Sequence, residues 1–71
     1  MNYTVILERS RTGYGAYAPD LPGCVAVGST REETVETMRE AMEFHLESMI
    51  KDGDEIPELT SSAVEIEVRV G

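Results

Sequence analysis

The first 28 residues of the chain contain three short stretches rich in β-branched, aromatic and other apolar residues, separated by turn residues. In residues 3–9, one side of an extended chain carries Tyr3, Val5 and Leu7. Similar stretches follow at residues 14–18 and 24–27. Period-two patterns with β-branched and aromatic residues predict strands, and the short connections predict a mainly antiparallel sheet.

A turn signal at residues 19–24 separates the second stretch from the third. Pro22 sets the first φ angle of a type II turn, and Gly23 accepts the positive φ angle at its second position. We therefore expect Pro22 and Gly23 to form a structural turn that leads directly into the third strand.

The hydrophobic period changes after residue 28. Apolar residues now recur every three or four positions, which predicts one face of an amphipathic helix: Val35, Met38, Met42, Leu46 and Met49. Thr30 and Glu33 fit a capping box at its start, and Gly53 fits a C-cap. The sequence predicts a helix over residues 31–52, about 33 Å long.

Residues 63–70 predict a last strand, because Val or Ile occupies every second position from Val64 to Val70 and charged residues stand between them. The expected order is β-β-β-α-β. This order predicts an α+β fold with two layers, in which one long helix lies on one face of a mainly antiparallel sheet. We expect residues 1–71 to form a single domain, because 71 residues allow only one.

The composition is acidic, and this narrows the possible partners. The chain has 6 Lys or Arg and 14 Asp or Glu residues, a net charge of −8. The basic residues are scattered, so we expect no direct binding to nucleic acid, which needs clustered Lys and Arg. An acidic surface suits a basic protein partner, although the charge could also serve only to keep the chain soluble.

The chain is too small to build a large core, and its sequence offers few residues for a disulfide or a structural metal site. Chains of this size usually need a disulfide, a metal or a partner subunit. One cysteine, Cys24, and one histidine, His45, supply neither a disulfide nor a conventional zinc site. We therefore expect a homo-oligomer, a dimer or larger, or else a very efficient small core. The lone cysteine and the absence of a long apolar run predict a cytoplasmic protein without membrane contact.

Two constellations raise the question of catalysis. A row of helical carboxylates could hold a divalent cation, but such a row is more often a solvated helix face: Glu36, Glu40, Glu43 and Glu47. Cys24 and His45 could form a nucleophilic pair, but a cysteine in a strand is usually an inert core residue. We therefore predict no catalytic, metal or cofactor residues and no enzyme activity, with a carboxylate and metal nuclease-like enzyme as the alternative.

Phe44 is the clearest candidate for a contact surface. At 100° per residue it falls opposite the apolar stripe of the helix, among small and acidic residues. An exposed Phe marks a surface for self-association or for a partner. We name five candidate partner-binding residues, in the 19–24 turn and on the helix: Asp20, Leu21, Glu40, Phe44 and Glu47. The last strand is a further candidate, since it could pair with another chain if it lies at an edge.

Several of these segments together resemble one known family. They are residues 3–8, 17–24 with the Pro-Asp-Leu-Pro-Gly-Cys turn, 28–33, 39–41 and 52–57. Their content and order resemble the HicB-like antitoxin domain over nearly the whole chain. The resemblance implies a partly RNase-H-like fold without a working nuclease site, and a role in a type II toxin–antitoxin system.

The resemblance also implies a partner. In that family the antitoxin binds a small basic mRNA-cleaving toxin, HicA-like, and covers its RNA-binding or catalytic surface. Many members continue into a C-terminal DNA-binding domain, but no helix follows residue 70 here, so we expect no such domain. The alternative within this fold is an orphan oligomeric binding module that has no toxin.

Overall fold

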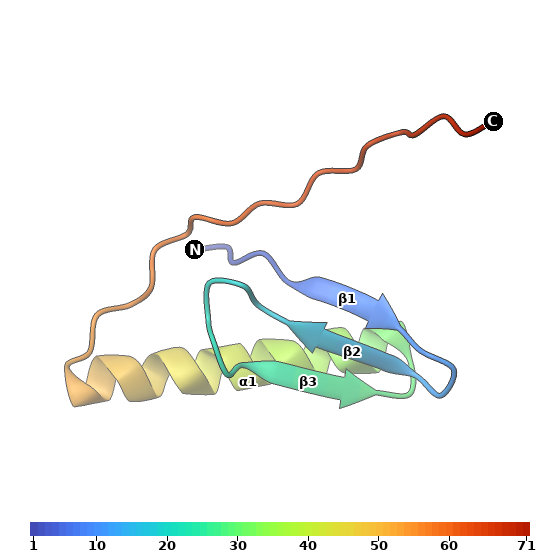
Figure 1. The fold of residues 1–71 in the computed structure, drawn as a ribbon. Coiled ribbons are helices and arrows are strands. Elements are labelled where there is room, and N and C mark those ends of the chain that lie inside the picture. The colour runs from blue at the N-terminus through green and yellow to red at the C-terminus, as the bar shows by residue number, and fades with distance from the viewer.

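The computed structural model describes residues 1–71 and contains three strands and one helix (Figure 1). Strands β1 (Ile6–Arg9), β2 (Tyr14–Tyr17) and β3 (Val25–Gly28) are followed by helix α1 (Arg31–Asp52). The strands pair antiparallel in the order β1-β2-β3. The predicted α+β class, an antiparallel sheet followed by one long helix, is confirmed.

The face of the sheet toward α1 carries small side chains. Leu7, Ala16 and Ala26 lie opposite one another on the three strands. The two alanines are buried and allow Met38 of α1, only 2% exposed, to approach the sheet closely. The buried core contains six residues, namely Ala16, Ala18, Leu21, Cys24, Ala26 and Met38. Tyr3, Val5 and Leu7, predicted to share one face, pack against this core together.

The turn before β3 has the predicted geometry. The backbone N–H of Cys24 donates a hydrogen bond of 3.1 Å to the carbonyl oxygen of Leu21, which places Pro22 and Gly23 at the central positions. Gly23 has a φ of 87°, a value that side chains strongly disfavour. The turn returns the chain to the sheet beside β2.

Helix α1 begins and ends at the predicted residues. The hydroxyl of Thr30 accepts a hydrogen bond of 3.1 Å from the backbone N–H of Glu33. At the other end Gly53 has a φ of 77°, and its N–H donates to the carbonyl oxygen of Ile50 at 3.2 Å. Both ends therefore satisfy backbone groups that a helix leaves unpaired.

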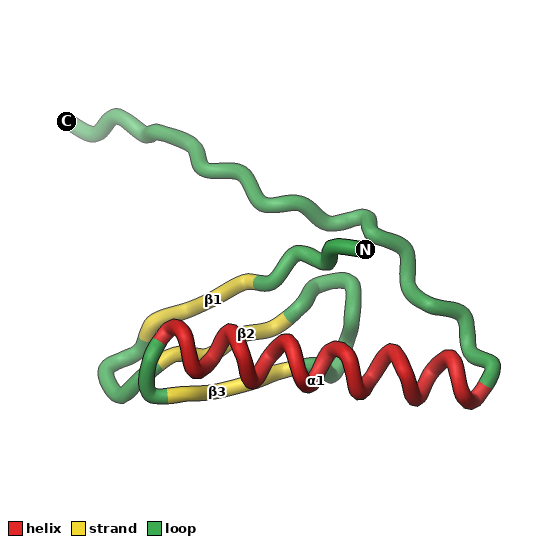
Figure 2. Tube along the Cα trace, turned by 180° about the vertical axis from the view of Figure 1, so that it is seen from behind, coloured by secondary structure: helices red, strands yellow, loops and turns green.

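The helix is much longer than the sheet that it covers. Its 22 residues span about 33 Å, whereas each strand has four residues and spans about 13 Å. Figure 2 shows that the C-terminal half of α1 projects past the strands. Met42, Leu46 and Met49 are consequently only half-buried.

The predicted fourth strand is not formed, and the first is shorter than predicted. Residues 63–70 have no strand partner, and they run away from the rest of the chain as an extended segment (Figures 1 and 2). An extended segment becomes a strand only through hydrogen bonds to a neighbour, which its sequence cannot show. For the same reason β1 begins at Ile6, which faces the last residue of β2, Tyr17, and not at Tyr3.

Candidate functional site

The outer side of α1 carries acidic residues around one aromatic side chain. Glu40, Glu43, Phe44 and Glu47 are all exposed, and their spacing of three and four residues places them on one side of the helix. Phe44 is 73% exposed. We call these four residues the acidic face. The predicted exposure of Phe44, opposite the apolar stripe, is confirmed.

The carboxylates of the acidic face are not neutralised within the chain. The structure contains one ion pair, between Arg39 and Glu36 at 3.4 Å. Helix α1 as a whole has seven acidic and three basic residues. These seven are half of the 14 acidic residues of the chain. The acidic face is therefore a rigid surface that can attract a basic partner and can offer it an apolar contact at its centre.

The two candidates in the 19–24 turn make internal contacts instead. The carboxylate of Asp20 accepts hydrogen bonds from the backbone N–H groups of Thr60 and Ser61 at 3.0 and 2.8 Å. It also accepts from their hydroxyls at 2.9 and 2.7 Å. We call this arrangement the Asp20 clamp. The neighbouring Leu21 is fully buried, with 0% exposure.

The hydrogen bonds of the Asp20 clamp favour the charged carboxylate. They hold the pKa of Asp20 below its ordinary value of 3.8, and the backbone and hydroxyl groups of Ser61 contribute most. The partners of Asp20 lie forty residues further along the chain, so no local motif could have indicated them. The structure thus gives Asp20 an anchoring role and places Leu21 in the core.

An apolar groove lies between α1 and the chain from Met1 to β1. Its volume is about 370 Å³. Eight of its twelve lining residues are hydrophobic: Met1, Tyr3, Val5, Leu7, Val35, Met38, Met42 and Leu46. All of these residues except Met1 lie on the apolar faces that the sequence predicts for the first strand and the helix, but the sequence does not indicate a groove between the two. We call this feature the apolar groove.

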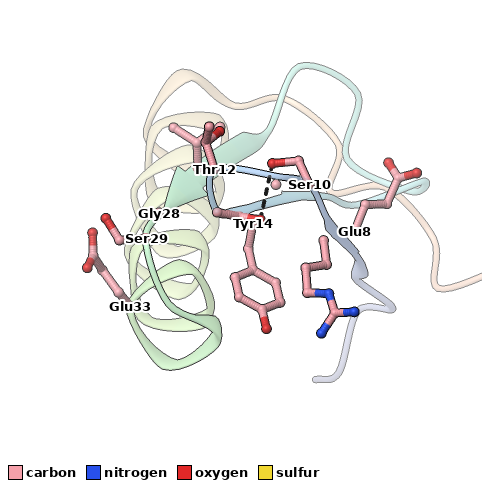
Figure 3. Close-up of a pocket in the computed structure, with 11 residues that line it drawn as sticks. Glu8, Ser10, Thr12, Tyr14, Gly28, Ser29 and Glu33 are labelled. Atoms are coloured by element: carbon pink, nitrogen blue, oxygen red, sulfur yellow. Dashed lines mark hydrogen bonds between the residues drawn. The ribbon is translucent and has the colours of Figure 1, made fainter.

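A second hollow lies at the end of the β1–β2 hairpin, and only two of its 11 lining residues are hydrophobic (Figure 3). Its volume is about 730 Å³. Figure 3 shows its two carboxylates, Glu8 and Glu33, on opposite sides of the opening. Nowhere in the structure do three His, Cys, Asp or Glu side chains gather as a metal site.

The only thiol of the chain is poorly placed for nucleophilic chemistry. Cys24 is 5% exposed and belongs to the core. Burial raises the pKa of the Cys24 thiol, which lowers the fraction of reactive thiolate.

No helix of the structure combines the length and the apolar composition needed to cross a membrane.

Comparison with known families and proteins gives consistent matches. Residues 3–69 match the family described as HicB-like antitoxin of bacterial toxin-antitoxin system. The chain is 42% identical over 57 residues to a UPF0150 protein of Synechocystis, covering 79% of this chain and 72% of that protein. It is 33% identical over 57 residues to Antitoxin HicB 2 of Photorhabdus laumondii, covering 80% of this chain.

Some relatives are considerably longer than this chain. The match spans 41% of the Photorhabdus antitoxin. It spans 43% of a 14.9 kDa protein of Haemophilus phage HP1, to which the chain is 39% identical over 57 residues. Among solved structures, a chain from a HicA3 and HicB3 toxin-antitoxin complex superposes with a TM-score of 0.70 and 25% identity. That match covers 84% of this chain and 70% of the other.

Proposed function

Because the chain belongs to the HicB-like antitoxin family, we propose that it binds and neutralises a small basic toxin of the HicA-like, mRNA-cleaving class. Binding would cover the RNA-binding or catalytic surface of the toxin. The similarity to a chain from a HicA3 and HicB3 toxin-antitoxin complex supports this class of partner. The role is non-enzymatic, since the chain acts by occupying a surface.

The observation that carries the proposal is the acidic face of α1. A protein that cleaves RNA presents basic residues to the phosphates of its substrate. Unpaired carboxylates at Glu40 and Glu47 compete for those basic residues. Phe44 lies between them and supplies an aromatic anchor of the kind that dominates binding energy at protein interfaces. We assign partner contact to these three residues.

Asp20 and Leu21 take no direct part in this proposal. The oxygens of Asp20 are occupied by Thr60 and Ser61, and the side chain of Leu21 is inaccessible. The protein works as a homo-oligomer in our proposal, because only six apolar residues are buried within one chain.

Affinity purification tests the proposal. The tagged chain is isolated from its own cells at low salt, and the proteins that accompany it are identified by mass spectrometry. We expect a small Lys- and Arg-rich protein in a fixed ratio. Its RNA cleavage is then measured with and without the chain, and the chain should suppress it.

Two results would overturn the proposal. One is recovery of the chain alone from cells that are shown to express a neighbouring gene for a small basic protein. That result would favour an orphan oligomeric module. The other is a copurifying basic protein whose RNA cleavage is unchanged by a saturating amount of the chain.

A further inference from the structure

Residues 63–70, which we call the tail, have the properties of a strand without a partner. No backbone hydrogen bond joins the tail to the rest of the chain. Its apolar side chains alternate with its charged ones, and they are almost fully in solvent: Val64, Ile66, Val68 and Val70 are 73–93% exposed. Four aliphatic side chains in one row are an unusual surface to leave in water.

The place that such a strand would fit is present on the same chain. The outer edge of β1 has no strand partner, because the sheet order is β1-β2-β3. The apolar groove lies beside this edge, between β1 and α1. A strand added to β1 would turn every second side chain toward α1 and would place those side chains over Val5, Leu7 and Val35. The tail has apolar residues at every second position.

The residues just before the tail, which we call its root, are held by hydrogen bonds, and the tail then diverges from the β1 strand of the same chain. The Asp20 clamp holds Thr60 and Ser61, and Thr4 donates a hydrogen bond of 2.8 Å to the carbonyl oxygen of Ser61. Beyond this point the tail diverges from β1 in both views (Figures 1 and 2). The tail lengthens the molecule to 53 Å, against 27 and 17 Å in the other directions.

We propose that the tail of one copy of this chain adds as a fourth strand to the β1 edge of a second copy, and that the exchange is reciprocal. Each copy holds one donor strand and one acceptor edge. In a dimer with a twofold axis, the tail of each copy therefore pairs with the β1 edge of the other. The exchange covers the apolar groove and the β1 edge in both copies. It also enlarges the core of a chain that alone buries only 7 of its 71 residues.

Light scattering and nuclear magnetic resonance test the exchange on the purified chain alone, so the result is independent of toxin binding. We expect a mass twice the 7.8 kDa of one chain. In a mixture of isotope-labelled and unlabelled chains, a filtered NOESY spectrum should show contacts between methyl groups of Ile66 or Val68 in one copy and Leu7 or Val35 in the other.

Two outcomes overturn the proposal. A monomer in which the same methyl contacts occur only within one chain means that the tail closes onto its own β1. A monomer whose tail amides exchange rapidly with water means that the tail does not pair with any β1 edge. The groove then stays open to a strand from another protein.

A pair of variants tests the role of the apolar row. Val68→Asp places a charge on the side proposed to face the groove and should yield a monomer of unchanged helix content by circular dichroism. The matched control, Glu67→Gln, alters the neighbouring residue on the other side of the tail and should remain a dimer. A dimeric Val68→Asp variant contradicts the proposal. If that variant fails to fold, the filtered spectrum of the unaltered chain decides.

Discussion

At the scale of single residues, the junction between β3 and α1 depends on the small size of Gly28, which has no side chain. A Cβ atom on Gly28 would lie 2.5 Å from Oγ1 of Thr34 and 3.1 Å from its backbone nitrogen. Thr34 cannot easily retreat, because it is fully buried and its hydroxyl donates to the carbonyl oxygen of Thr30 at 2.8 Å. Gly28 therefore sets how closely the start of the helix approaches the sheet.

We predict that Gly28→Ala lowers the free energy of unfolding by about 1–3 kcal/mol, the usual cost of overpacking a tight site. Urea denaturation followed by circular dichroism measures it. Gly15→Ala is the matched control, since a Cβ there meets only the carbonyl oxygen of Ala26, at 4.0 Å. Equal losses in the two variants would show that contact with Thr34 is not the cause.

The Asp20 clamp makes the root of the tail sensitive to acid. The folded pKa of Asp20 lies below 3.8, and the unfolded pKa is near 3.8, so the clamp stabilises the folded state above that pH. This contribution is lost as the pH falls through the folded pKa.

We therefore predict that the amide resonances of Thr60 and Ser61 titrate together with the Asp20 carboxyl, with a midpoint below pH 3.8. A pH series of NMR spectra measures the midpoint, and the same amides should not titrate in Asp20→Asn. A midpoint at or above 3.8 would contradict the clamp.

Phe44 is predicted to dominate binding of the proposed toxin. Truncating an aromatic residue at the centre of an interface typically costs about 2 kcal/mol or more, which is about 30-fold in Kd. Phe44→Ala should weaken the complex by at least that factor, as measured by calorimetry, without loss of helix content, because the side chain is exposed. Val27→Ala, which removes an exposed apolar side chain on the sheet, is the control and should bind normally.

At the scale of elements, local signals were read correctly from the sequence and nonlocal ones were not. The limits of α1 are set by residues within one turn of each end, Thr30 with Glu33 and Gly53, so the sequence contains them. The tail has an equally clear alternation, yet it forms no strand here, because pairing depends on a distant partner.

The same distinction applies to the candidate site. Helical periodicity is enough to place Phe44 on the exposed side of α1. It is not enough for Asp20, whose hydrogen-bond partners lie forty residues away, or for Leu21, whose burial depends on how the turn packs onto the sheet. The sequence does not indicate the apolar groove for the same reason, since its two sides, the chain from Met1 to β1 and helix α1, lie far apart in the sequence.

The start of α1 offers a direct test of a local signal. We predict that Thr30→Ala lowers the free energy of unfolding by about 1 kcal/mol, because the N–H of Glu33 loses its acceptor at 3.1 Å. Thr30→Ser retains a hydroxyl and should be nearly neutral. Both values come from urea denaturation, and a loss of similar size in the two variants would mean that the methyl group of Thr30, not its cap, matters.

At the scale of the whole molecule, the negative charge is unevenly distributed. Two of the 14 acidic residues, Glu8 and Asp20, precede the helix, whereas seven lie on α1 and five follow it. Arg9 and Arg11 balance the two acidic residues that precede the helix, so the field that a basic partner meets comes from α1 and the residues after it. Long-range attraction should therefore guide such a partner toward α1 and the residues that follow it.

This asymmetry predicts how association with a basic toxin responds to salt. Exposed charges are screened beyond about 8–10 Å at 0.1–0.15 M salt, so the association rate should fall steeply as salt rises, while dissociation changes less. Stopped-flow kinetics measures both. Glu40→Gln with Glu47→Gln should reduce the salt dependence, because these carboxylates lie on the acidic face. Glu55→Gln with Glu58→Gln removes the same charge outside the helix and should change it less. Equal effects of the two double variants would show that only net charge, and not the acidic face, guides the encounter.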